Sequence, residues 1–309
     1  MAQSTLQEMA REVYLYSAEV APLPLCQRFI RDRYRKICDR VLWSFKLGRG
    51  TFQTPDAYST GTVTMTNSSA IVAGSGTAWT STLIGQQLKV NGLVFTITAV
   101  GSTTSLTIDQ SWYGSTTSGL TYIICQAYIT PTPTDFHGWY SVIDPVSSWK
   151  LRLGMNSSEI DRIDARRSAT GTPYVLCNGV YNTASTPYMV YELWPSPLSI
   201  KQYMYTYERR IPDLTAPTDT PYAIIRSDIL VKGALADLAR WPGTPERKNP
   251  MWDTMLINWR SREAEFEAEV QKQIVEDQTI MQNDLSFGRD FRYAPIDANF
   301  MQSHSFPSY

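Results

Sequence analysis

Charge is scarce in this sequence, and so are the residues that usually build metal or nucleophile sites. Only 18% of the 309 residues are charged, and the net charge is −1; a typical globular protein has about 25% charged residues. A dedicated nucleic-acid binder carries a basic surplus that this balance does not provide. Two histidines and four cysteines without a CxxC motif leave little material for metal or nucleophilic catalysis. We therefore expect no cofactor and no enzymatic activity.

Long apolar runs and a secretory leader are also missing. Nowhere do about 18 apolar residues follow one another, as a membrane-spanning helix requires, and the first residues lack a basic stretch followed by an apolar one. Cys26 and Cys38 are too far apart in one predicted helix to form a disulfide, and Cys125 and Cys177 stand alone. We expect four reduced thiols in a reducing compartment and no contact with a membrane.

The first 50 residues have the periodicity of two helices. Apolar side chains recur every three or four positions on both sides of Pro22 and Pro24, which interrupt the pattern. We expect the second helix to run from Leu25 to about Gly48, where glycine favours a helix end.

The helical period returns in residues 220–284. Thr220 as N-cap and Pro221 in the first turn suit the start of a helix, because proline lacks only an N–H that would be unpaired there. A last helix is predicted from about residue 250 to 283. Since this segment and residues 1–50 are each too short to bury their apolar stripes, we predict that they form one discontinuous helical bundle domain.

Opposite charges mark two of these helices. Between Arg28 and Arg49 eight bases stand against two acids, and residues 250–285 hold eight acids and three bases. Acids four positions apart repel each other by roughly 0.2–0.5 kcal/mol per pair, which an apposed basic surface in the same chain or in a neighbouring copy would offset. Contact of the bases with phosphates is the alternative. The candidate inter-subunit or partner-facing charges are Arg28, Arg31, Arg35, Arg40, Glu263, Glu265, Glu267 and Glu269.

Residues 58–127 differ in composition, since Lys89 and Asp109 are the only charged side chains there. Short alternating runs predict strands, and Asn91-Gly92 is a strong hairpin signal. We expect a small β-barrel or sandwich module inserted between the helical segments. The expected strands are 62–65, 87–90, 95–98, 105–108 and 122–124. Three aromatic side chains of the module are candidates for stacking on sugar rings, although core packing is the favoured interpretation: Trp79, Trp112 and Tyr113.

Residues 128–219 predict a mixed, mostly β connecting region. A short helix is expected over 157–167, with Asn156 and Glu159 as a capping box. His137 lies near Asp135 and Asp144 in the sequence and could form an acid–base group or a metal corner with them. A surface or structural histidine is the favoured interpretation.

Residues 285–309 predict an extended C-terminal tail that is rich in aromatic side chains and has no helical or strand period. Aromatic residues in such a tail usually anchor on another surface, either of a partner or of the same chain. The predicted anchors are Phe287, Phe291, Tyr293, Phe300, Phe306 and Tyr309.

The complete order predicts an α+β protein, and this order resembles that of head-to-tail adaptor (connector) proteins of tailed bacteriophages. The resemblance rests on the helical ends, on LWPSPLSIKQYMYTYERRIPDL and TPYAIIRSDILVKGALADLA between them, and on the long acidic last helix. In addition, residues 61–79, Gly85 and Tyr113-Gly114 are similar to a β module that recurs in phage virion proteins. The β insert departs from the minimal, all-helical adaptor.

The resemblance implies a structural protein of the virion neck that is assembled in the host cytoplasm. Such adaptors form an oligomeric ring, commonly of twelve copies, which docks on the portal protein and binds tail or nozzle proteins below. DNA passes through the lumen without sequence-specific binding, and the C-terminal tail, here from Phe287 to Tyr309, often inserts into the portal.

Two other functions stay open at the level of sequence. The β module of residues 58–127 would serve a carbohydrate-binding or fibre-anchoring virion protein. An enzyme such as a peptidoglycan hydrolase would need paired carboxylates in one cleft, for which Asp135 and Asp144 are the candidates.

Overall fold

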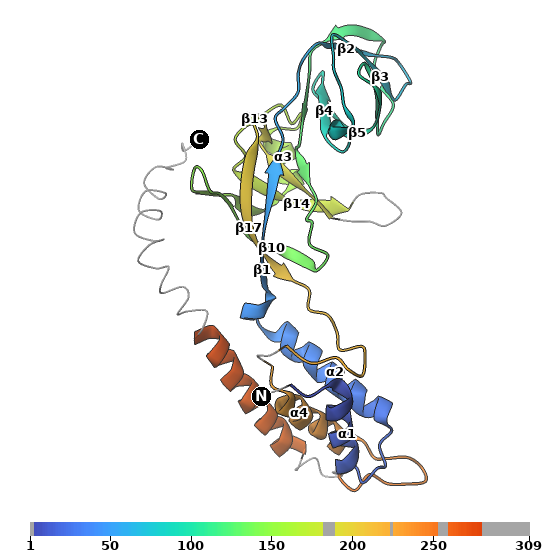
Figure 1. Cartoon of the computed structure of the whole chain (residues 1–309), viewed down its shortest axis with the longest axis vertical. Coiled ribbons are helices and arrows are strands. Elements are labelled where there is room, and N and C mark those ends of the chain that lie inside the picture. Colours follow the sequence, from blue (N-terminus) through green and yellow to red (C-terminus); the bar gives the residue numbers. More distant parts are fainter. Residues whose placement is uncertain (1–2, 182–188, 223–224, 253–258, 280–309) are drawn as a thin grey trace. The chain divides into compact units, whose positions relative to one another are not determined.

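Described segments near both ends of the chain belong to one structural unit, and the middle forms another (Figure 1). The described residues up to Leu47 and from Arg210 onward form the first, here called the helical unit, and those within 48–209 form the second, the β unit. The computed structural model describes residues 3–181, 189–222, 225–252 and 259–279. Apart from one short helix within the β unit, the described helices and the sheets are segregated along the chain, which makes the fold α+β, as the sequence predicts.

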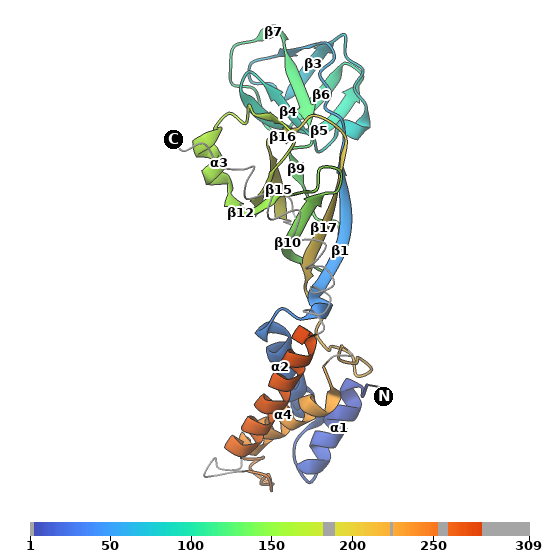
Figure 2. The same ribbon diagram turned by 90° about the vertical axis from the view of Figure 1, so that its left-hand side faces the viewer.

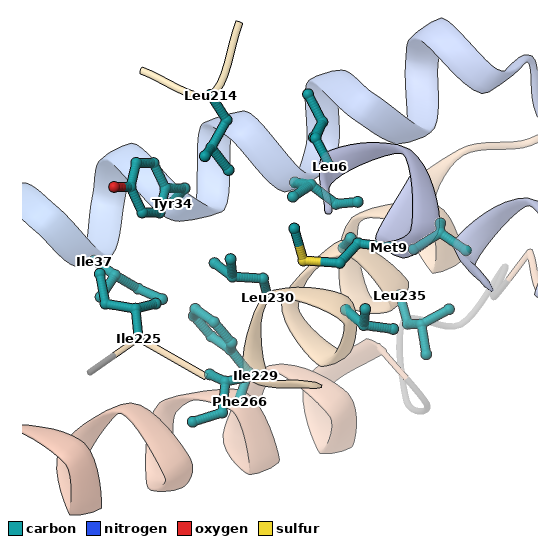
Figure 3. Close-up of a cluster of buried hydrophobic side chains, with 14 of the residues drawn as sticks. Leu6, Met9, Tyr34, Ile37, Leu214, Ile225, Ile229, Leu230, Leu235 and Phe266 are labelled. Atoms are coloured by element: carbon teal, nitrogen blue, oxygen red, sulfur yellow. The ribbon is translucent and has the colours of Figure 1, made fainter. Parts of the chain in front are cut away.

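Four helices of the helical unit share one apolar core (Figure 3). They are α1 (Leu6–Tyr16), α2 (Leu23–Arg40), α4 (Ser227–Arg240) and a helix described over residues 259–279. Leu6, Ile30, Leu230 and Phe266, one from each helix, are buried in this core. Full burial of each such side chain contributes roughly 1.5–3 kcal/mol to the free energy of folding. Because the four side chains come from distant parts of the sequence, each helix is held in place by residues far from it along the chain.

Helix α2 ends at Arg40, so the expectation that it reaches Gly48 is wrong. Val41 is extended, and the indole N–H of the fully buried Trp43 donates to the carbonyl of Ile37 at 2.8 Å. This bond satisfies one of the carbonyls that the last turn leaves unpaired. A 3-10 turn, Ser44–Lys46, and strand β1 (Leu47–Thr54) follow.

Helix α4 begins at Ser227, so the predicted start at Thr220 is also wrong. The carbonyls of Asp219 and Pro217 accept the N–H groups of Leu6 and Gln7 at 2.8 and 3.0 Å. The segment before α4 therefore satisfies the first turn of α1, and it can do so only in a non-helical conformation.

The last helix does not include residues 250–252, which the sequence assigned to it. Asn249 is buried, and its side-chain amide donates to the carbonyls of Leu238 and Trp241 at 2.8 Å each. Asn249 thereby satisfies the end of α4, and the chain turns through Met251, whose N–H donates to the Asn249 side chain.

Seven strands of the β unit form a nearly closed, barrel-like sheet, the order of which is β7-β2-β3-β6-β5-β4-β8 (Figure 2). The five predicted strands are confirmed, and Asn91 and Gly92 both have positive φ in the β4–β5 turn, as a type I′ turn requires. The strands are β2 (Thr62–Met65), β3 (Ile71–Ser75), β4 (Gln87–Val90), β5 (Leu93–Ser102), β6 (Ser105–Ile108), β7 (Thr117–Leu120) and β8 (Tyr122–Cys125).

Two four-stranded sheets and a short strand pair complete the β unit. One sheet has the order β1-β17-β10-β11, the other β12-β14-β15-β9, and β13 pairs with β16. Their bounds are β9 (Tyr128–Ile129), β10 (Phe136–Asp144), β11 (Trp149–Lys150), β12 (Arg152–Asn156), β13 (Thr170–Gly171), β14 (Val175–Tyr181), β15 (Met189–Trp194), β16 (Ser196–Pro197) and β17 (Lys201–Arg209).

Aromatic side chains fill the space around β1, β10 and β17. The rings of Tyr205 and Tyr207 lie so close to β1 that a Cβ at Gly50 or Gly48 would be 2.4–2.5 Å from ring atoms or the Tyr205 hydroxyl. Only glycine fits at these two positions of the strand. Phe52 stacks on Tyr203 with the ring centroids 5.0 Å apart.

Helix α3 (Ser157–Ile163) is shorter than the predicted helix over 157–167. Its start is as expected, since the N–H of Asn156 donates to Glu159 at 3.1 Å. It ends because the carboxylate of Asp164 accepts the N–H groups of Ser168 and Ala169 at 2.8 Å, which holds the next residues in a turn.

Candidate functional site

A buried arginine joins three helices of the helical unit. The guanidinium of Arg33, on α2, binds both carboxylate oxygens of Asp237 on α4 at 2.7 Å. It also binds both oxygens of Glu263 on the helix of residues 259–279, at 2.7 and 2.8 Å. Only 3% of the Arg33 side chain is exposed, and it lies over the Phe266 ring at 4.7 Å. This geometry fixes the rotation of the last helix against α2.

Opposite charge explains why this arginine stays ionised. Burial by itself would lower the pKa of Arg33, but the hydrogen bonds and charges of Asp237 and Glu263 outweigh it and raise the pKa above its ordinary value. Two carboxylates around one guanidinium also use its donors almost completely, as a buried ion pair requires.

Two further contacts extend the attachment of the last helix along the chain. Arg40 pairs with Glu267 at 2.5 Å, and both side chains are partly exposed. The buried carboxylate of Asp277 accepts the backbone N–H of Ser44 at 2.9 Å and also its hydroxyl hydrogen bond. Three acids of the last helix, Glu263, Glu267 and Asp277, are thus matched within the same chain by α2 and the turn after it.

Several of the predicted partner-facing charges therefore have partners in their own chain. Glu263 binds Arg33, Arg40 binds Glu267, and Glu269 lies 3.3 Å from Lys272 and 3.7 Å from Lys232. Arg35 binds Asp213 with two hydrogen bonds of 2.7 Å.

Other charges on the same two helices are left without a close partner. Arg28 reaches Asp32 only at 3.7 Å, and 76% of its side chain is exposed. The buried Nε of Arg31 has no acceptor among the described residues, although its terminal nitrogen donates to Gln27 at 3.3 Å. Glu265 is exposed and forms no ion pair in the described part of the chain.

An open groove of about 480 Å³ lies beside these unmatched bases. Seven residues line it: Leu25, Arg28, Phe29, Asp32, Arg35 and Lys36 of α2 and Asp237 of α4. The lining therefore combines two apolar side chains with three bases and two acids. A phosphate backbone would meet the two carboxylates in this lining, so a protein surface that carries both apolar and acidic side chains suits the groove better.

The structure separates the three aromatic candidates of the β module. Trp79 and Trp112 are buried, and their indole N–H groups donate to the hydroxyl of Tyr122 at 3.1 Å and to the carbonyl of Ser115 at 2.9 Å. Both belong to the core of the barrel-like sheet. Tyr113 alone of the three is exposed, at 84%.

Asp135, His137 and Asp144 do not come together. The last two lie on β10, Asp135 directly precedes it, and the strand's rise puts the two carboxylates roughly 30 Å apart along the chain. Asp135 binds Arg209 at 2.6 Å and Tyr207 at 3.0 Å. Asp144 is buried and binds Lys201 at 2.9 Å. His137 is exposed, so the three side chains form no common cleft.

A polar cluster in the β unit was not predicted from the sequence. Lys89, the single base of the β module, donates to the Arg167 carbonyl and the Ser196 hydroxyl at 2.5 Å each. The Arg167 side chain in turn binds the buried Glu192 at 2.6 Å. Burial lowers the pKa of Lys89. The cluster fastens the barrel-like sheet to the connecting region.

The remaining predicted features have simple outcomes. All four cysteines are free and buried. In the described ranges, no group of three His, Cys, Asp or Glu side chains is placed to share a metal ion, and none of the helices there is both long and apolar enough to cross a bilayer. The six predicted aromatic anchors between Phe287 and Tyr309 lie outside the described residues.

No protein-family model matches the sequence, and no curated protein is found to be similar to it. Function is therefore inferred from the residues and their geometry.

Proposed function

We propose that this chain is a structural head-to-tail adaptor of a tailed bacteriophage, which joins portal and tail in the virion neck as an oligomeric ring around the passing DNA. The observation that supports this best is the groove on α2. The helical unit neutralises its central charges internally, yet it leaves Arg28 and Lys36 exposed beside Leu25 and Phe29 in an open groove. A surface of this kind suits a protein partner.

The proposed ring needs a body that keeps its shape and an insert that reaches its partners. The discontinuous helical bundle would form the body, since Arg33, Arg40 and Asp277 tie its last helix to α2. The β unit would form the insert. The buried hydrogen bonds of Lys89 and Arg167 would hold the barrel-like sheet in a fixed orientation to the connecting region of the same unit.

A neutral chain is compatible with a channel for DNA. A passing duplex must slide, and strong pairing with phosphates would hold it in place. The net charge of −1 therefore fits a lumen through which DNA moves without sequence-specific contacts.

Negative-stain imaging of the full chain, alone and mixed with the portal protein of the same phage, tests the proposal. We expect rings docked on the portal, commonly of twelve copies by the resemblance. Deletion of 285–309 should leave folding unchanged, as far-UV circular dichroism would show, and weaken docking because the aromatic anchors are lost. A full-length chain that stays monomeric and ignores the portal would contradict the proposal.

A carbohydrate-binding or fibre-anchoring role for the β module is the second candidate, and the exposure of Tyr113 favours it. A glycan array probed with the full chain and with Tyr113→Ala separates the two functions. Binding that this substitution abolishes would support sugar recognition, and a blank array would leave the module as scaffold.

A further inference from the structure

The outward face of the last helix has features that match the groove on α2. Residues Ala264, Ala268 and Val275 lie on this face, and Val275 is 60% exposed. Glu265 and Glu276 are exposed beside them. The two acids lie along one side of the small and apolar side chains, and the exposed Lys272 lies between them. This surface is here called the acidic strip.

The groove offers the complementary pattern. Leu25 and Phe29 provide apolar surface, and Arg28 and Lys36 provide exposed bases at its rim. At 1.5 Å per residue, the groove from Leu25 to Lys36 and the strip from Glu265 to Glu276 each span about 16 Å, while Arg28 and Lys36 lie about 12 Å apart along α2. The groove and the strip are therefore similar in length and opposite in exposed charge, and the long side chains of the two bases would have to reach acids that are spaced about 4 Å wider.

Given the proposed ring, on which this inference rests, we propose that the acidic strip of one copy docks in the α2 groove of the next copy. Val275 and the two alanines would cover Leu25 and Phe29, while Glu265 and Glu276 would face Arg28 and Lys36.

The contact cannot form within one chain. The last helix packs on α2 through Phe266 and Val270 and through the pairs of Arg33 and Arg40, so the acidic strip faces away from its own core. A groove and a strip on different faces of one molecule form a heterologous contact, which closes into a ring when the rotation between copies allows it.

Charges next to the contact do not oppose it. Lys272 also lies on the outward face, but it pairs with Glu269 at 3.3 Å. Of the two acids in the groove, Asp237 is bound by Arg33, and Asp32 lies 3.7 Å from Arg28. Arg28 thus shares its charge with Asp32, and Glu276 lies within electrostatic reach of Arg226. Among the described residues, the charges without a close partner are therefore Lys36 in the groove and Glu265 on the strip.

A complementary charge reversal tests the contact. The groove variant carries Arg28→Glu with Lys36→Glu, and the strip variant carries Glu265→Lys with Glu276→Lys. Each should weaken self-association roughly a hundredfold, because like charges then face each other across the interface. An equimolar mixture should restore assembly, since the acidic strip of the first variant fits the basic groove of the second and the converse also holds.

A matched control keeps the change in net charge but leaves the groove intact. Arg11→Glu with Lys248→Glu alters two exposed bases of the helical unit by the same total charge as the groove variant. Sedimentation velocity of full-length chains, free and on the portal, is the measurement, and far-UV circular dichroism confirms that each variant is folded.

The outcomes separate this contact from the proposed function. The contact is supported if the groove variant and the strip variant each fail to assemble, the control assembles, and the mixture of the two variants assembles again. Rings that form equally well in all variants overturn the contact and leave the adaptor function standing, as does a portal that binds the groove in place of a second copy. Wild-type chains that remain monomeric with and without portal overturn both.

Discussion

Replacing Arg33 by alanine should be the most damaging single charge removal in the helical unit. The substitution deletes the guanidinium that holds Asp237 and Glu263 by four hydrogen bonds of 2.7–2.8 Å. Two carboxylates are then left close together in a site that the rest of the protein keeps largely dry. The side chain also loses its contact with the Phe266 ring.

The expected cost follows from the exposure of the partners. Breaking a buried ion pair costs about 3–5 kcal/mol, because one charge remains buried without a partner. Asp237 and Glu263 keep 18% and 28% of their side-chain surface exposed, so water can replace part of the lost bonding, and we expect about 3 kcal/mol. The Arg40–Glu267 pair is more exposed, and Arg40→Ala should cost about 0.2–1 kcal/mol.

Urea unfolding of the full chain, followed by far-UV circular dichroism, measures both costs. The triple variant Arg33→Met, Asp237→Asn, Glu263→Gln should recover much of the stability, since it leaves no buried charge unpaired. The reasoning is refuted if Arg33→Ala is no more destabilising than Arg40→Ala, or if neutralising the two acids gives no recovery.

Two predictions concern the β unit. The hydrogen bonds of Ser147 and Lys201 outweigh burial and lower the pKa of Asp144 to about 2; ionisation of this carboxylate thus contributes roughly 2 kcal/mol above pH ~4. This contribution is lost as the pH falls from about 4 to about 2. In calorimetry, the stability of Asp144→Asn should therefore depend less on pH over this interval than that of the wild type. An unchanged dependence of stability on pH would contradict the assignment. Gly50→Ala should cost roughly 1–3 kcal/mol because its Cβ would meet the Tyr205 ring, while the exposed neighbour Thr51→Ala should be nearly neutral; equal effects would refute the packing argument.

The sequence predicts the opposed charged helices but not the residue that joins them. Arg33 was absent from the predicted set, although a signal for it exists. It stands within the apolar stripe of Ile30, Tyr34 and Ile37, all buried, where a base must find acids in order to be tolerated. Which acids these are depends on the rotation of two helices distant in sequence, and local periodicity does not encode that rotation.

Helix ends were predicted less well than helix faces, and the causes are tertiary. The Trp43 side chain donates to a carbonyl of α2, and the Asn249 side chain donates to two carbonyls at the end of α4. The Asp219 carbonyl accepts an N–H of α1. Each of these residues caps a helix from outside the cap positions that sequence rules inspect. By contrast, the β4–β5 hairpin was predictable because its turn is decided by Asn91 and Gly92 themselves.

Burial divides the charges of these helices into two sets that should respond differently to salt. The Arg33 network is enclosed, so dissolved ions screen it little. Arg28, Lys36 and Glu265 are exposed, so dissolved ions screen them readily, with a Debye length of ~8 Å at physiological ionic strength. Raising the salt concentration should therefore dissociate copies that meet through the α2 groove while the unfolding midpoint of the helical unit stays unchanged. Sedimentation and urea unfolding over one salt series measure the two responses. If unfolding and dissociation shift in parallel, then the same charges support fold and assembly, and the division into a buried set and an exposed set is wrong.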